Sequence, residues 1–217
     1  AVAGADVPIA DYGLYLDNTG QLSESEVMWR GAADRRASLP GLASARASMM
    51  AQAALDRALV ESCSEALKMA GEVRVMERGP IASFHAAMAA ALCGNKTYAT
   101  KAIAELQQNF PHVTAVTQYY VPELAAAADI GVNEPASALQ LLIGIGDYDQ
   151  VSLAPYLRGL AHTEIGQMPA AIFDFQMVLA HRGTAFTLGS SSYPMAEIGV
   201  ARAAAAGHNK TDSVAAY

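Results

Sequence analysis

The chain has 217 residues, of which 53% are hydrophobic and 16% are charged, and its formal net charge is −7. The hydrophobic share excludes a disordered chain, and the acidic balance excludes a protein that binds nucleic acid through a basic face. No run of about 18 apolar residues is present, so we expect no insertion into a membrane. Because the sequence begins at Ala1 rather than at methionine, we expect a piece of a longer or processed protein.

Six positions in the chain have the character of turns between paired helices. Alanine supplies most of the hydrophobic residues, and alanine is the strongest helix former. The turn positions are Gly20, Glu61, Gly94, Asn133, Gly166 and Gly207. They predict helical pairs at approximately residues 6–39, 47–79, 80–113, 119–150 and 152–183, with a partial pair at 193–217.

The same order of small and large residues follows each predicted turn. A small residue lies five positions after the turn and a large or apolar one four positions later, as at Ala171 and Phe175. The equivalent small positions are Ser25, Ala66, Ala99 and Ala138, with Asp212 a poor match, and the equivalent later positions are Trp29, Ala70, Ile103 and Leu142. Helices that cross closely need small residues at the crossing. This pattern predicts an all-α fold, a single right-handed TPR-like superhelix (α-solenoid) of about five to six helix-turn-helix pairs.

Several longer segments of the chain carry a closer resemblance. They are Leu106-Gln-Gln-Asn-Phe-Pro111, Tyr120-Val-Pro122, Glu134-Pro-Ala-Ser-Ala-Leu-Gln-Leu-Leu142, Tyr156-Leu-Arg-Gly-Leu-Ala161, Phe173-Asp-Phe-Gln-Met-Val-Leu-Ala-His-Arg-Gly183 and Gly199-Val-Ala-Arg-Ala203. With them the chain resembles the C-terminal tetratricopeptide region of acidobacterial serine/threonine protein kinases. The resemblance implies a sensory or recruiting region that binds protein partners. The glycine-rich ATP loop, the His-Arg-Asp loop and Asp-Phe-Gly are absent. Kinase activity could therefore belong only to a longer parent protein.

Catalytic, metal and cofactor motifs are not found in the sequence. His162-Thr-Glu164 matches half of a zinc deaminase signature, but the Pro-Cys-x-x-Cys half is missing, so we interpret both as solvent-facing helix residues. His181 before Arg182 and Gly183 is typical of a helix C-terminal cap. We therefore expect no enzyme activity, no metal site and no cofactor.

Cys63 and Cys93 are the only two cysteines, and they lie 30 positions apart. This spacing fits neither a disulfide framework nor a metal site, so we expect buried free thiols. Free thiols favour the cytoplasm, whereas a disulfide would favour an oxidising compartment. The kinase resemblance implies a soluble domain that lies in the cytoplasm or, beyond a membrane span, on the extracytoplasmic side of the inner membrane. The compartment stays open at this point.

The first helix of each pair is expected to line a concave groove. The residues that we expect to face this groove are Phe84, Met88, Tyr120, Glu123, Tyr156, Leu160 and Glu164. Tyrosines anchor partners well because they offer a large contact area. The sequence therefore predicts a protein or peptide partner in an open groove, and a homodimer is a further possibility. The alternative is a sensor that binds a small peptide or metabolite, which an apolar cavity lined by Tyr120 and Tyr156 would favour.

Overall fold

The computed structural model describes residues 12–13, 15–17, 19–37, 43–76, 78–183 and 191–207, and no strand occurs among them. The helices are α2 (Leu22–Ala37), α3 (Ala43–Leu59), α4 (Cys63–Arg74), α5 (Pro80–Leu92), α6 (Lys96–Asn109), the π-helix η1 (Val116–Tyr120), α7 (Val121–Ile130), α8 (Pro135–Leu142), the 3-10 helix η2 (Ile143–Val151), α9 (Ala154–Glu164), α10 (Met168–Ala180) and α12 (Ser192–Ala206). The predicted all-α fold is confirmed. None of the described helices combines the length and apolarity that crossing a membrane requires.

Five of the six predicted turns are confirmed by the backbone. Left-handed φ angles between 62° and 77° occur at Gly20, Glu61, Gly94, Asn133 and Gly166. Each of these turns has the two hydrogen bonds of a Schellman motif; at Gly94 the N–H of Asn95 donates to Ala90 O (2.8 Å) and that of Gly94 to Ala91 O (2.9 Å). Gly207, the sixth position, has a φ of −75° and ends α12 without the left-handed turn. Asp212 lies outside the described residues.

The small residues predicted at helix crossings are buried. Ser25, Ala66, Ala99, Ala138 and Ala171 each have a relative exposure of 0%. The helices also approach closely around Phe175, whose ring lies between two glycines. A Cβ atom added to Gly159 or to Gly199 would lie 2.6 Å from this ring. The absence of side chains at these two positions therefore makes room for Phe175.

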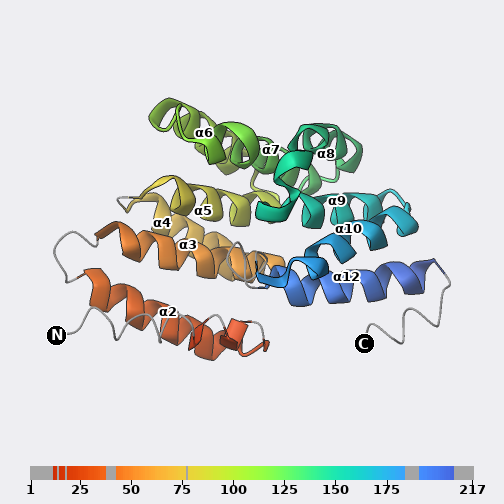
Figure 1. The fold of residues 1–217 in the computed structure, drawn as a ribbon. Helices are drawn as coiled ribbons and strands as arrows, with labels where there is room; N and C mark the ends of the chain where they lie inside the picture. Colours follow the sequence, from red (N-terminus) through yellow and green to blue (C-terminus); the bar gives the residue numbers. More distant parts are fainter. Residues whose placement is uncertain are drawn as a thin grey trace.

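The first helices of successive pairs lie side by side, and the array curves until α12 contacts α3 (Figure 1). α3 packs on α5, α5 on α7 and α7 on α9, while α12 packs on α9 and α10 and also contacts α3. The N–H of Ser191 donates to Asp56 Oδ1 at 3.1 Å, and Arg202 Nη1 lies 2.8 Å from Glu61 Oε1. These contacts span more than half of the chain, and they enclose the space between the first helices.

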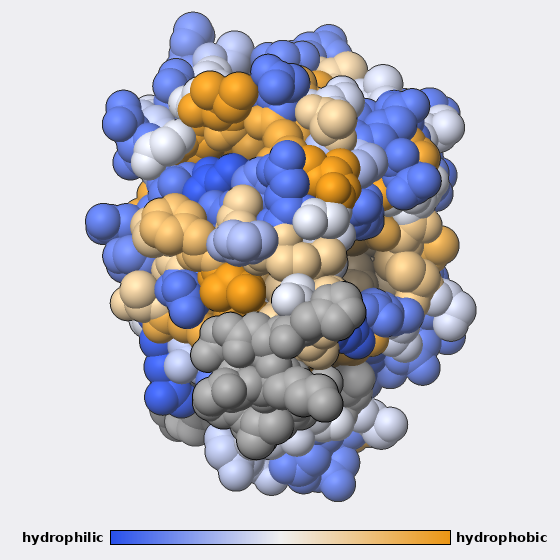
Figure 2. Space-filling model, turned by 90° about the vertical axis from the view of Figure 1, so that its right-hand side faces the viewer, coloured by the Kyte–Doolittle hydropathy of each residue, from blue (hydrophilic) through white to orange (hydrophobic). Residues whose placement is uncertain are grey.

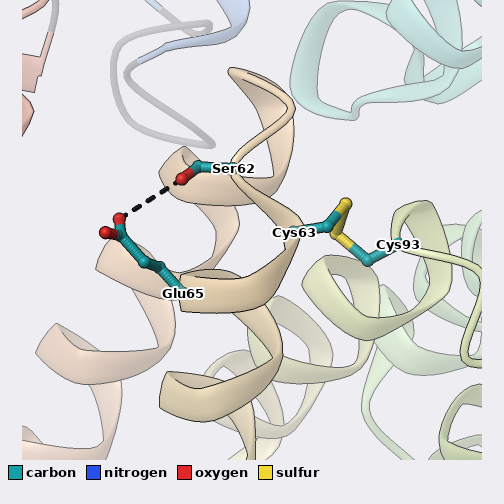
Figure 3. The surroundings of a disulfide bond; sticks show 4 residues. All are labelled: Ser62, Cys63, Glu65 and Cys93. Atoms are coloured by element: carbon teal, nitrogen blue, oxygen red, sulfur yellow. Dashed lines mark hydrogen bonds between the residues drawn. A yellow bond between two sulfur atoms is a disulfide. The ribbon is translucent and has the colours of Figure 1, made fainter.

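Cys63 and Cys93 form a disulfide, so the prediction of buried free thiols is wrong. Cys63 begins α4 and Cys93 follows the last residue of α5, and the two helices pack against each other (Figure 3). This packing brings the two Cα atoms to 5.3 Å, a usual separation for a disulfide. Both cysteines are half-buried rather than buried. Cys63 lies two positions after the turn at Glu61, and Cys93 lies one position before the turn at Gly94. The two cysteines are therefore at neighbouring turns although they are 30 positions apart in sequence, and this spacing did not reveal the pairing.

Candidate functional site

Most of the residues predicted to face an open groove are inside the protein. Phe84, Met88, Tyr120, Glu123 and Tyr156 all have relative exposures of 6% or less. Leu160 is half-buried and Glu164 is exposed. The prediction that the first five are surface anchors is therefore wrong. The physical reason is that the first helices pack directly on one another, so their inward side chains meet each other instead of solvent.

Aromatic stacking shows how this part of the interior is filled. The rings of Phe84 and Tyr120 are stacked with centroids 4.0 Å apart, and Tyr119 packs edge-on against Tyr120 at 5.0 Å. Tyr120 ends the π-helix η1, which leads directly into α7. A π-helical turn spaces its hydrogen bonds five residues apart rather than four, so it rotates the side chains that follow. Tyr120, at the end of η1, and Glu123, in the first turn of α7, are both buried.

A pocket remains where the first helices end, and we call it the inner pocket. Its volume is about 300 Å³. Its apolar wall comes from six helices and includes Leu59, Leu92, Ile130, Leu160, Phe175 and Met195. Three predicted groove residues, Tyr156, Leu160 and Glu164, line it, whereas Tyr120 does not. The contact between α5 and α7 beside it is close, because a Cβ on Gly131 would lie 2.1 Å from Ala91 O. The inner pocket therefore has a rigid, mainly apolar wall.

Polar groups occupy the solvent side of the inner pocket. Glu61 and Arg202 form their ion pair there, and both side chains are more than half exposed. Burial raises the pKa of Glu164. Burial also raises the pKa of the Tyr156 hydroxyl; the charge of Glu61 raises this pKa further, and the charge of Arg202 lowers it. Glu164 has no ion-pair partner among the described residues. The pocket thus presents one carboxylate that is available to a cation.

The molecular surface beside α9, α10 and α12 is mixed in character. In Figure 2, which shows the right-hand side of Figure 1, hydrophilic residues interrupt the hydrophobic ones across the face. A large contiguous apolar patch on a surface marks a site for protein partners. This face therefore gives less support to a broad docking surface than the inner pocket gives to a small ligand.

Glu123 is the most unusual ionisable residue of the interior. Its relative exposure is 0%, and neither carboxylate oxygen has a hydrogen-bond partner of ordinary geometry among the described residues. Burial raises the pKa of Glu123 to about 8, and the nearby backbone N–H groups of Leu153 and Ala154 offset this only in part. Glu123 is therefore mainly uncharged at neutral pH, and it does not line the inner pocket.

His162 and Asp149 have structural partners that the sequence did not reveal. Asp174 accepts a hydrogen bond from Arg158 Nε (2.9 Å) and lies 2.9 Å from His162 Nδ1. Arg158 also donates to both carboxylate oxygens of Asp149, at 2.9 and 2.8 Å. The interpretation of His162 as simply solvent-facing is therefore wrong, because its ring joins α9 to α10. His181 follows α10 and its Nδ1 lies 2.9 Å from Met177 O, which confirms the predicted cap.

Sequence reasoning missed Glu61 and Arg202 as residues of the inner pocket. Glu61 was identified only as a turn, and no local pattern signals an ion pair that joins residues 141 positions apart. No group of three or more histidine, cysteine, aspartate or glutamate side chains converges within the described ranges. No protein-family model matches the chain, and no curated protein or solved structure is significantly similar to it.

Proposed function

We propose that this chain is a non-catalytic binding module that holds a small ligand in the inner pocket. The ligand class that the pocket suits is a small peptide or metabolite with an apolar body and one cationic group. The observation that carries the proposal is the pocket itself, about 300 Å³ of mainly apolar space with Glu164 at its solvent side. Pockets for small ligands begin at about this size and combine an apolar wall with a few polar groups.

The repeat architecture supports a binding role. We propose that the helical pairs are TPR-like repeats in a right-handed superhelix. The five Schellman turns and the buried small residues five positions after each of them support this. Arrays of this kind stack their repeats into extended concave surfaces that are used for binding. The resemblance to kinase-associated repeats would make the module a sensory region of a bacterial signalling protein, with the inner pocket as its input.

The disulfide supports a placement for this module. Disulfides persist in oxidising compartments and are rare in the cytosol. Of the two placements left open by the sequence, we therefore propose the extracytoplasmic side of the inner membrane. Alkylation of the isolated protein, followed by a mass measurement, checks the disulfide on which this placement rests. We expect no modified cysteine unless the protein is reduced first.

Phenethylamine, an aromatic ring with an ammonium group, is a suitable first probe for the inner pocket. We expect saturable shifts of the amide NMR signals of Leu160, Glu164 and Met195. Glu164→Gln should weaken binding about tenfold, because a charge-assisted hydrogen bond contributes more than about 1.4 kcal/mol. Glu197→Gln removes an exposed charge from α12 outside the pocket and should leave binding unchanged.

Two results would contradict this function. The first is equal binding of phenylacetate, which has the same ring with the opposite charge. The second is unchanged phenethylamine binding in Met195→Trp, a variant that fills the pocket from α12.

A further inference from the structure

A second pocket lies on the outer side of the array, and we call it the outer groove. Its volume is about 310 Å³, and it shares no lining residue with the inner pocket. The second helices α4 and α6 form its walls: α4 contributes Leu67 and Arg74, and α6 contributes Tyr98 and Lys101. Both helices pack on α5, which lies between them. On α4, Gly71 has no atom within 4 Å of an added Cβ, so the groove is open there.

The cations of the outer groove contrast with the acidity of the whole chain. Arg74, Arg78 and Lys101 line the groove together with one carboxylate, Glu105, although the net charge of the chain is −7. Arg74 and Arg78 both lower the pKa of the Tyr98 hydroxyl electrostatically, against the burial that raises it most. Both guanidinium groups therefore lie close enough to the Tyr98 hydroxyl to give this part of the groove a positive potential.

One of the three cations is already engaged and two are available. Arg78 Nη2 lies 2.8 Å from Glu105 Oε2, and Arg78 Nη1 donates to Arg74 O at 2.6 Å. Arg78 therefore neutralises the carboxylate of the groove and caps the end of α4. Arg74 and Lys101 are exposed, and neither has an ion-pair partner within the described part of the chain. These two side chains leave about two positive charges uncompensated at the groove.

The start of α6 adds a third source of positive potential. Asn95 and Thr97, which line the groove, belong to the N-cap and first turn of this helix. The N-terminal end of a helix carries a partial positive charge. The Asn95 side chain accepts the N–H of Tyr98 at 3.0 Å, which keeps the first turn in place. The N-terminal end of α6 and the cations of the outer groove therefore both favour an anionic ligand.

We propose that the outer groove binds a small molecule that carries a tetrahedral oxyanion group, a phosphate or sulfate monoester, on an apolar body. The Arg74 guanidinium offers a planar fork of donors and Lys101 a point charge, a combination that matches a tetrahedral oxyanion. The apolar body lies against Leu67, Ala102 and the Tyr98 ring. This site is independent of the inner pocket and of the function proposed for it.

Phenyl phosphate is the probe that tests the outer groove. At constant ionic strength we expect it to shift the amide NMR signals of Thr97, Tyr98 and Lys101 saturably. The double variant Arg74→Gln/Lys101→Gln should weaken binding about tenfold or more, because two charge-assisted contacts are lost. Lys68→Gln is the matched control, since Lys68 is an exposed lysine on α4 that does not line the groove.

The remaining arms decide whether the chemistry is as proposed. Phenyl sulfate and phenyl phosphate, tested in parallel, show which oxyanion is preferred, and saturable binding of either supports the site. Absence of saturation with both overturns the proposal. An equal loss of binding in Lys68→Gln also overturns it, because it would show attraction to general positive charge. Binding of benzyl alcohol with the same strength overturns it too, because that probe has no charge.

Discussion

Two regions of the interior contain buried charged residues and treat them differently. Near the N-terminal end, Asp17, Asp56 and Arg57 are all at most 2% exposed, and each has polar partners. In the central region, Glu123 is equally buried but has neither a cation nor a hydrogen bond of ordinary geometry among the described residues. A buried group stays ionised only where partners replace the water it has lost. The first region surrounds its buried ionisable groups with polar partners, and the second region holds an acid that is mainly uncharged at neutral pH.

The partners in the N-terminal region join separate segments of the chain. Asp17 accepts hydrogen bonds from the Ser25 hydroxyl and from Trp29 Nε1, the latter at 2.7 Å. Arg57 of α3 lies 3.8 Å from Asp17 and 3.2 Å from Glu65. Burial still raises the pKa of Asp17, although these partners lower it. Polar contacts, together with a core rich in alanine and methionine, therefore hold this end of the array.

Arg57→Ala is the substitution from which we expect the largest loss of stability, and it tests the buried ion pair of the N-terminal region. Removing the cation leaves Asp17 buried without its ion pair, and breaking a buried pair destabilises by about 3–5 kcal/mol. We expect a loss of this order in the free energy of unfolding, measured by urea denaturation. Arg46→Ala is the matched control on α3, since Arg46 forms an exposed pair with Asp34 and should lose at most about 1 kcal/mol. Equal effects of the two variants would contradict a special role for buried pairing.

The disulfide tests whether the N-terminal region depends on its junction with the centre. The double variant Cys63→Ala/Cys93→Ala removes the disulfide, which joins two residues 30 positions apart. We expect a loss of about 3 kcal/mol in the free energy of unfolding, chiefly because the unfolded chain gains freedom. Ser64→Ala alters an exposed neighbour on α4 and serves as the control. If reduction of the wild-type protein left its melting temperature unchanged, this expectation would be wrong.

The pH dependence of the free energy of unfolding tests the central region. The folded pKa of Glu123 is about 8 and its ordinary value is 4.5, so its contribution to stability is complete below pH 4.5 and is lost as pH rises through 8. Burial lowers the pKa of His85 from 6.5 to about 4, so His85 costs stability only as pH falls below 6.5. Between pH 6.5 and 8, therefore, Glu123 changes the free energy of unfolding and His85 does not. We expect a fall on the order of 2 kcal/mol over that interval.

Glu123→Gln should remove this fall, because an amide has nearly the shape of the protonated acid and does not ionise. The variant should match the wild-type protein below about pH 4.5 and exceed it in stability by a growing margin as pH rises toward 8, because only the wild-type side chain ionises when the chain unfolds. Glu24→Gln, at an exposed position on α2, should keep the wild-type pH profile. An unchanged slope in Glu123→Gln would show that the acid is already ionised and has found a partner.

The difference between local and distant contacts decides what could be predicted from the sequence. The turns at Glu61 and Asn133 were predicted although neither is glycine, because the residues around them repeat in register. The buried small residues were predicted for the same reason, since a helical pair packs within about 34 residues. The contact of α12 with α3 was not predicted, because it depends on small rotations that accumulate over every pair. The inner pocket follows from that contact, so only Tyr156, Leu160 and Glu164 were identified.

The π-helix η1 is another feature that the sequence did not predict. Nothing in the sequence from Val116 to Tyr120 distinguishes a π-helical turn from an α-helical one. The burial of Glu123 depends on residues near Leu153 and Ala154, about 30 positions away in sequence. Local periodicity could therefore predict the helices but not which of their faces became buried.

Gly159→Ala has the smallest expected effect and probes the apolar packing of the C-terminal half. The added methyl group would lie 2.6 Å from the Phe175 ring, which cannot move away because Gly199 is equally close on its other side. Overpacking of this kind destabilises by about 1–3 kcal/mol, and the better helix propensity of alanine offsets up to about 1 kcal/mol. We expect a net loss of about 1 kcal/mol in the free energy of unfolding.

Gly71→Ala, in the open position on α4, is the control and should stabilise slightly, because only helix propensity changes there. Phe175→Leu combined with Gly159→Ala should restore part of the loss, since a smaller side chain leaves room for the methyl group. A double-mutant cycle measures that coupling. If the two substitutions were additive, the ring and the glycine would not be in contact. The order of small and large residues that repeats along the chain would then have no packing role at this pair.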